Sequence, residues 1–194
     1  MFSHLTSRPF ICAISLLLAL TIMPLAAHAL TVENVTFEDR IAIGGSPLPL
    51  HNAALLRYLK FIKAYVAALY MPEGVNPDQV LSEVPKRLEL HYLVSIKGSD
   101  FGKGAEPTLQ LNQTPAELAR LRSRIDRINS TYRDVKPGDR YSLTYLPGRG
   151  TELALNGTPL TVIEGADFAA AYFGIWLGRN SIDDKLKRDL LKGR

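Results

Sequence analysis

Few polar side chains of this sequence are candidates for binding or catalysis, and Arg57 stands out because it lies in a long apolar run. A guanidinium that is buried without a partner is very costly, so Arg57 needs an anion nearby. The planar fork of its N–H donors suits a carboxylate, which it can hold through two parallel hydrogen bonds. Tyr65, further along the same run, could donate a phenolic hydrogen bond to the same anion. The two residues predict a site for the carboxylate of a small apolar molecule, with Arg57 as the anion anchor.

Both residues also have a purely structural interpretation. Arg57 could form an internal salt bridge, or it could lie at a strand edge where its side chain reaches water. Tyr65 could be a core tyrosine whose hydroxyl bonds to a backbone carbonyl. Strand alternation puts Tyr58 and Lys60 on the opposite face from Arg57, which makes them weaker candidates.

A second group of aromatic residues recurs at helical spacing in the apolar segment 166–177, which ends at Gly178. Core packing is the simplest role for such a stripe. An edge that faces a ligand is compatible with packing, since apolar pockets are lined by the same residue types. We therefore add Tyr172 and Trp176 to the candidate ligand-binding residues.

Other kinds of site are not indicated by the sequence. His51 and His91 are far apart, and neither has the spacing of metal ligands. There is no histidine–carboxylate pair, nucleophile elbow or phosphate-binding loop. The basic residues gather in 120–127 and 185–194 without interleaved aromatics, which indicates solvated helix faces rather than a nucleic-acid surface. We expect no metal, no cofactor and no nucleic-acid partner, and we assign no catalytic residue.

The predicted strands and helices that carry these candidate residues have their clearest signals in the C-terminal half. Segment 140–163 alternates between apolar and polar residues and is interrupted by turn residues, which predicts a β-meander. Its Asn156-Gly157 pair is a strong hairpin signal. The apolar segment 166–177 predicts a helix that must pack on this meander. A sheet covered by such a helix encloses an apolar space.

Period-two alternation also predicts strands in the N-terminal half. The long apolar run 54–71 could by its length be a helix, but its alternation favours strands, of which 63–71 is the more buried. The predicted strands are 32–37, 40–43, those within 54–71, and 86–96.

Helix signals lie between and after these strands. Thr114 and Glu117 form a capping box that starts a helix with one apolar stripe. Segment 100–111 has helical character but is interrupted by Pro107. A last amphipathic helix ends near Lys192. The order of strands and helices predicts an α+β domain with a largely antiparallel sheet.

Residues 1–29 have the pattern of a secretory signal peptide. An uncharged apolar run follows Arg8, and Ala27 and Ala29 are the small residues that precede cleavage before Leu30. A membrane anchor is the alternative, but the apolar run is shorter than the ~18 residues that a spanning helix needs. Residues 30–194 then form one domain with no cysteine, because the only one is Cys12. An exported domain without disulfides fits the bacterial periplasm.

Several segments together resemble a known fold. GDRYSLTYLPGRGTELALNG followed by FAAAYFGIWLG looks like the C-terminal half of the chalcone isomerase fold. Arg57 followed by FIKAYVAALYMP looks like its core strands, and LELHY fits the next one. The chain is most similar to bacterial exported chalcone isomerase-like proteins. The resemblance implies an open-faced β-sandwich, in which a large curved antiparallel sheet carries helices on one face and a ligand cleft between them.

The resemblance also implies roles for particular residues. Arg57 matches the family's cleft arginine, which pairs with the carboxylate in fatty-acid-binding members and stabilises an enolate in true isomerases. The position of the catalytic threonine of plant isomerases falls on Tyr65. The catalytic tyrosine and asparagine fall near Leu118 and Ile125, and the late-strand threonine falls near Arg149 or Thr151. The arginine matches and most of the catalytic set does not.

Three functions remain open at this point. The first is non-catalytic periplasmic binding of a small apolar or amphipathic anion, such as a fatty acid or an aromatic acid. The second is an isomerase, an intramolecular lyase in which Arg57 stabilises an enolate. The third is a scaffold that contacts another envelope protein through its basic helices.

Overall fold

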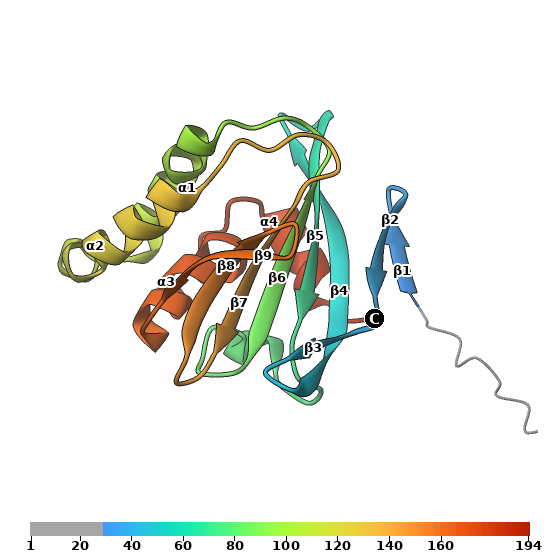
Figure 1. Cartoon of the computed structure of the whole chain (residues 1–194), viewed down its shortest axis with the longest axis horizontal. Helices are drawn as coiled ribbons and strands as arrows, with labels where there is room; N and C mark the ends of the chain where they lie inside the picture. The colour runs from blue at the N-terminus through green and yellow to red at the C-terminus, as the bar shows by residue number, and fades with distance from the viewer. Residues whose placement is uncertain (1–28) are drawn as a thin grey trace, which may run out of the picture.

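The computed structural model describes residues 29–194, so the predicted signal peptide lies outside the described residues except for Ala29. A seven-stranded antiparallel sheet forms the centre, with its strands in sequence order from β3 to β9 (Figure 1). Helices α1 and α2 are inserted between β6 and β7. The strands are β3 (Arg40–Ile43), β4 (Ser46–Tyr58), β5 (Ile62–Tyr70), β6 (Lys86–Tyr92), β7 (Arg140–Leu146), β8 (Gly150–Leu155) and β9 (Thr158–Ile163).

All four α-helices contribute to one large core on the same face of the sheet. This arrangement confirms the α+β prediction of a large antiparallel sheet with helices on one face. A short 3₁₀ helix, Pro77–Gln79, connects β5 to β6. The α-helices are α1 (Gly98–Asn112), α2 (Pro115–Thr131), α3 (Ala166–Leu177) and α4 (Asp184–Leu191).

A separate hairpin, β1 (Ala29–Val32) and β2 (Val35–Glu38), covers part of the opposite face (Figure 1). Strand β5 is therefore buried on both sides. Tyr65 and Leu69 belong to the helix-side core, whereas Val66 and Tyr70 pack against the hairpin side. Burial on both faces explains why this strand is a nearly continuous apolar run.

Two turns without glycine were not predicted. The expected single strand 32–37 is wrong, because Glu33 and Asn34 take positive φ angles of 51° and 63° and reverse the chain into the β1–β2 hairpin. Alternation through residues 57–61 is also wrong. Leu59 and Lys60 have φ angles of 49° and 70° and form the turn between β4 and β5.

Helix α1 runs without a break through Pro107, so the predicted interruption there is wrong. Close packing against the end of α2 fixes its position. A Cβ atom on Gly98 would lie 2.6 Å from the carbonyl oxygen of Tyr132, so only glycine allows this approach. The approach brings the ring of Phe101 onto that of Tyr132, with 4.6 Å between the centroids. The predicted capping box of α2 is confirmed.

The arginines of α2 were expected to form a solvated face, but several of them hold α2 against its neighbours. Arg122 pairs with Glu106 of α1 at 2.9 Å, and Arg124 pairs with Asp167 of α3 at 2.6 Å. Arg127 donates to the carbonyl oxygen of Val162 on β9. These guanidinium groups are already used within the domain, which leaves less positive charge for another protein.

Between residues 29 and 194, no helix is both long enough and apolar enough to cross a bilayer.

Candidate ligand-binding cavity

A cavity of about 560 Å³ lies between the helix side of the sheet and helices α1 and α3. Its lining is mostly apolar. The deeper wall of the sheet is formed by leucines from three neighbouring strands, Leu88, Leu143 and Leu153. Among the described residues that line it, none carries a positive charge, and the one acid is Asp100 at the start of α1. The volume lies within the range of about 300–1,000 Å³ that is typical of small-molecule sites.

Tyr65 and Trp176 meet in this cavity. The indole nitrogen of Trp176 donates a hydrogen bond of 2.9 Å to the Tyr65 hydroxyl oxygen, joining α3 to β5. Burial raises the pKa of Tyr65 well above its usual value, so the phenol stays protonated. Because the oxygen accepts from Trp176, the Tyr65 proton remains free to be donated to a ligand.

Tyr172 also lines the cavity, and its hydroxyl is held by other residues. It lies 3.0 Å from the hydroxyl of Tyr132 and donates to the side-chain oxygen of Asn129 at 3.3 Å. Burial raises the pKa of Tyr172 as well. The α3 aromatic stripe therefore serves both the core and the cavity wall, as the sequence suggested. Contact of Tyr65, Tyr172 and Trp176 with a ligand stays a prediction.

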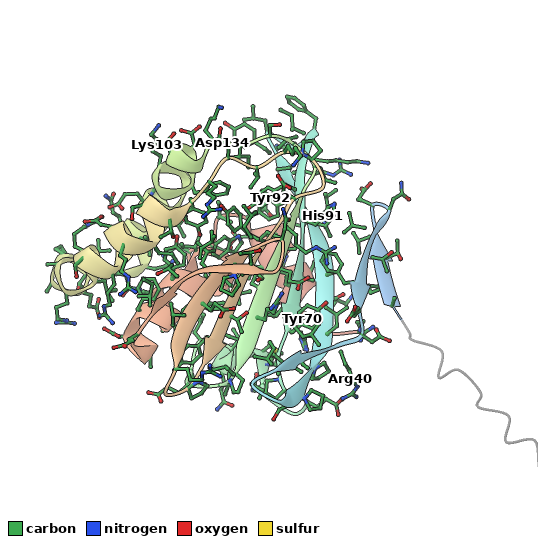
Figure 2. All side chains as sticks on the ribbon, viewed as in Figure 1. Arg40, Tyr70, His91, Tyr92, Lys103 and Asp134 are labelled. Atoms are coloured by element: carbon green, nitrogen blue, oxygen red, sulfur yellow. The ribbon has the colours of Figure 1, made fainter. Side chains whose placement is uncertain are left out.

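Tyr92 on β6 is a further lining residue, and it was not among the ligand-binding candidates that the sequence indicated. It pairs with Tyr65 across β5 and β6, and the two rings meet edge to face at 5.6 Å. Within residues 29–194 its hydroxyl makes no hydrogen bond to another side chain or to the backbone. Burial raises its pKa well above the usual value, so it too stays a neutral donor. Figure 2 shows Tyr92 beside His91 at the upper end of β6.

Arg57 does not line the cavity, contrary to its predicted place in the apolar hollow. Its guanidinium lies 3.3 Å from the carboxylate of Glu33, in the turn of the β1–β2 hairpin, and its side chain is 43% exposed. Lys63 bonds to the same carboxylate, and this bond lowers the pKa of Glu33. The internal salt bridge, one of the alternatives for Arg57, is what the structure contains.

The neighbours of Arg57 face the cavity instead. Leu56 and Tyr58 line it, because strand alternation puts both side chains on the face of β4 opposite to that of Arg57. Tyr58, Ile62 and Ile182 are lining residues that are also exposed, and we call these three residues the cavity mouth. For Tyr58 and Ile62 the sequence signal was the apolar run 54–71, but the turn that it contains was not recognised.

Comparison with known proteins identifies the family. The chalcone isomerase-like family matches residues 29–192. The chain belongs to the chalcone isomerase-like family. An uncharacterised protein of Haemophilus influenzae is 32% identical over 131 residues, which cover 66% of this chain and 60% of that protein. The crystal structure of an Arabidopsis thaliana fatty-acid binding protein superposes with a TM-score of 0.62 at 15% identity, covering 84% of this chain and 96% of that one.

These matches confirm the family resemblance and the chalcone isomerase-type architecture. At 15% identity, the plant structure shows a shared fold and no more.

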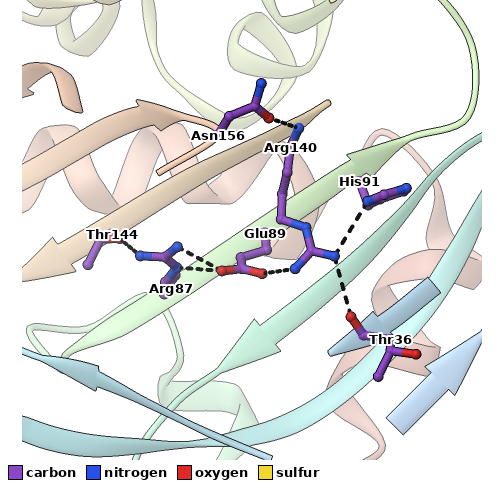
Figure 3. Close-up of polar contacts among 7 residues, drawn as sticks. All are labelled: Thr36, Arg87, Glu89, His91, Arg140, Thr144 and Asn156. Atoms are coloured by element: carbon purple, nitrogen blue, oxygen red, sulfur yellow. Dashed lines mark hydrogen bonds and ion pairs between the residues drawn. The ribbon is translucent and has the colours of Figure 1, made fainter. Parts of the chain in front are cut away.

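The far face of this chalcone isomerase-like sheet carries a polar network that is already satisfied (Figure 3). Glu89, 5% exposed, accepts hydrogen bonds from Arg87 and from Arg140. Arg140 also reaches the Thr36 carbonyl of the hairpin and the ring of His91. Burial, and then the charge of Arg140, lower the pKa of His91. The network attaches the hairpin to the sheet. Within residues 29–194, no three His, Cys, Asp or Glu side chains are grouped so that they could hold a metal ion.

Proposed function

We propose that this chalcone isomerase-like protein binds a small apolar or amphipathic molecule, such as a fatty acid or an aromatic acid, without converting it. The observation that carries the proposal is the apolar cavity of about 560 Å³ with two neutral phenol donors on one wall. The signal-like N-terminal segment supports binding in the periplasm as part of the same proposal. That a protein of the same fold is a fatty-acid binding protein is consistent with it.

The positions of the lining residues suggest how such a ligand lies. Tyr65 and Tyr92 are close to the mouth residue Ile62 along their strands, whereas Leu88 lies deeper on β6. An acyl chain directed toward the leucines gains about 0.8 kcal/mol for each buried methylene. The polar end then stays near the two phenols and the mouth, where desolvation is least costly.

Arg57 has a different role in this proposal from the one that the sequence indicated. A fully buried carboxylate would lack a cation among the described lining residues, so an acid head group must stay near the mouth. Arg57 and Lys63 share one carboxylate outside the cavity and so leave an excess of positive charge there. This charge attracts an anion to the mouth without direct contact inside.

Binding is supported better than isomerisation. A proton-transfer enzyme needs a base within hydrogen-bond reach of the substrate. The described lining residues include no histidine or lysine, and Asp100 is paired with Lys103 at 2.8 Å at the exposed start of α1. The tyrosines stay protonated because burial raises their pKa values.

The test is a titration of the purified protein with a fluorescent fatty acid, combined with a variant that fills the cavity. Ala105 lines the cavity from α1 and is buried, so Ala105→Phe should weaken binding at least about tenfold by occupying the volume. Arg57→Ala, which removes a charge outside the cavity and no lining residue, should keep the affinity within about threefold of the wild type. Absence of binding by the wild type, or equal binding by Ala105→Phe, would contradict the proposal. Incubation with a chalcone panel tests isomerisation, and turnover above the buffer rate would contradict the non-catalytic part.

A further inference from the structure

The turn between β4 and β5 exposes an unusual amount of apolar surface. We call residues 58–62 the β4–β5 tip. Tyr58 is 60% exposed, Leu59 is 59% exposed and Phe61 is 72% exposed. Isolated exposed apolar residues are normal, but consecutive ones at the end of a projecting hairpin indicate a surface that meets an apolar partner. In Figure 1 this turn stands at the top of the view, at the end of the long β4 and β5 strands.

The residues at the turn of the tip are not the ones that its backbone conformation favours. Leu59 and Lys60 both take the left-handed conformation, with φ angles of 49° and 70°. The β8–β9 hairpin uses nearly the same pair of angles, 50° and 79°, but places Asn156 and Gly157 there. Asparagine and glycine are the residues that this turn prefers, whereas leucine and lysine adopt it with strain. The tip therefore keeps an apolar and a basic side chain at the expense of turn stability, as expected of a functional surface.

The charge next to this apolar surface is positive. Lys60 forms no ion pair within residues 29–194, and Arg57 and Lys63 together share only Glu33. The hairpin end thus presents three cations and one carboxylate beside exposed aromatic and aliphatic groups. Aromatic residues with flanking lysines suit the interface of a bilayer, where rings enter the head-group region and lysines meet anionic lipids.

The tip is continuous with the cavity mouth. Tyr58 and Ile62 belong to both, because each lines the cavity and is exposed to solvent. Ile182, in the segment before α4, adds a third exposed apolar side chain at the mouth. A flat apolar partner that covers the tip would therefore also cover the entrance.

We propose that the β4–β5 tip docks on a bilayer that contains anionic lipids, so that the cavity mouth opens onto the membrane surface. The apolar side chains enter the head-group region while Lys60, Lys63 and Arg57 contact lipid phosphates. An amphiphile can then pass between the bilayer and the cavity without crossing water. Docking itself does not require a ligand in the cavity, so it can be tested separately from the proposed binding function.

The test is co-sedimentation of the protein with vesicles of phosphatidylcholine alone or of phosphatidylcholine with phosphatidylglycerol. The decisive variant combines Leu59→Asn with Lys60→Gly, which removes one exposed apolar side chain and the lysine of the tip and installs the turn used at Asn156-Gly157. Val162→Ser is the matched control, because Val162 is a similarly apolar residue, 40% exposed, on the far edge strand β9. All proteins keep the same N-terminal segment, so its contribution to sedimentation is common to them.

We expect the wild type and Val162→Ser to sediment with the anionic vesicles and to be released at about 0.5 M salt. The double variant should bind at least about tenfold more weakly while its thermal unfolding midpoint is unchanged or higher. Equal binding by the double variant and the wild type would overturn the proposal. Absence of wild-type binding to the anionic vesicles would also overturn it. That result is expected if the tip binds another protein instead of a bilayer. Fatty-acid binding measured without vesicles should be the same for both proteins.

Discussion

Trp176 on α3 donates its indole N–H to the hydroxyl of Tyr65 on β5, and this 2.9 Å bond spans the cavity wall between helix and sheet. Both side chains are buried, with exposures of 9% and 6%. The bond gives the indole N–H of the chain's only tryptophan an acceptor. The Tyr65 hydroxyl proton has no acceptor among the described residues. Trp176 is therefore both a structural link and a built-in fluorescent reporter of the cavity.

Tyr65→Phe should destabilise the protein by about 1–2 kcal/mol, because the buried indole N–H loses its acceptor. The Trp176 emission should change at the same time, since its hydrogen bond is lost. Urea unfolding followed by this emission measures both effects. Unchanged stability together with an unchanged emission maximum would show that the bond does not exist in solution.

Tyr92→Phe is the companion variant on the neighbouring strand. Its hydroxyl has no hydrogen-bond partner in the described part of the chain, so its removal should change the unfolding free energy by less than about 0.5 kcal/mol. Affinity for an amphiphile should fall, because one donor for the polar end is lost. A marked loss of stability would contradict this account of Tyr92.

Arg57→Ala should leave fatty-acid affinity within about threefold of the wild type when no membrane is present, because Arg57 lies outside the cavity. Its effect on stability should also be small, since the pair is exposed and Glu33 keeps its bond to Lys63. Equilibrium titration and thermal unfolding measure the two quantities. A loss of affinity beyond about tenfold would restore Arg57 as a direct ligand anchor.

The C-terminal half of the fold could be predicted because its turns and caps have local sequence signals. Helix 166–177 has the bounds that the sequence indicated, and the predicted Asn156-Gly157 hairpin is present. The capping box of Thr114 and Glu117 is also present. At these positions the local preference and the tertiary structure agree.

The face of Arg57 could not be predicted, for two physical reasons. The Leu59-Lys60 turn has no glycine, so the alternation was extended through it. Both faces of β4 and β5 are also covered, one by helices and the other by the β1–β2 hairpin, so apolar residues on either side look equally buried. Tyr65, Tyr172 and Trp176 were found because burial and cavity lining call for the same residue types.

Lys86 should make stability rise with pH in a mildly alkaline window. It is fully buried at the start of β6, donates to the carbonyls of Ser82 and Val84, and lies 4.4 Å from the ring centre of Tyr145. Burial lowers its pKa to about 8. Below pH 8 the Lys86 amine is protonated in both the folded and the unfolded protein. Above it the folded state releases the proton while the unfolded state keeps it, so folding is favoured.

Between about pH 8 and pH 9.5 the unfolding free energy of the wild type should therefore increase by about 1–2 kcal/mol. Buried tyrosines reverse the trend at higher pH, because the unfolded chain ionises them first. Lys86→Met should remove the increase. Urea unfolding at several pH values is the measurement, and a flat wild-type profile over this window would refute the account of Lys86.

Gly98 and Gly104 of α1 should respond in opposite ways to alanine. A Cβ atom at Gly98 would lie 2.6 Å from a backbone oxygen, so Gly98→Ala should cost about 1–3 kcal/mol. Gly104 has nothing within 4 Å, so Gly104→Ala should gain up to about 1 kcal/mol from helix propensity. Thermal unfolding distinguishes the two variants, and equal effects would argue against the close packing of α1 on the end of α2.

If the cavity holds an apolar chain, the affinity for a fatty acid must depend on the length of that chain, which a chain-length titration measures. Saturated fatty acids of increasing length are titrated into the delipidated protein while the emission of Trp176 in the cavity wall is followed. The affinity should increase about fourfold for each added methylene until the cavity is filled, and then level off. An affinity that does not depend on chain length, or the absence of any saturable change in Trp176 emission, would contradict the account.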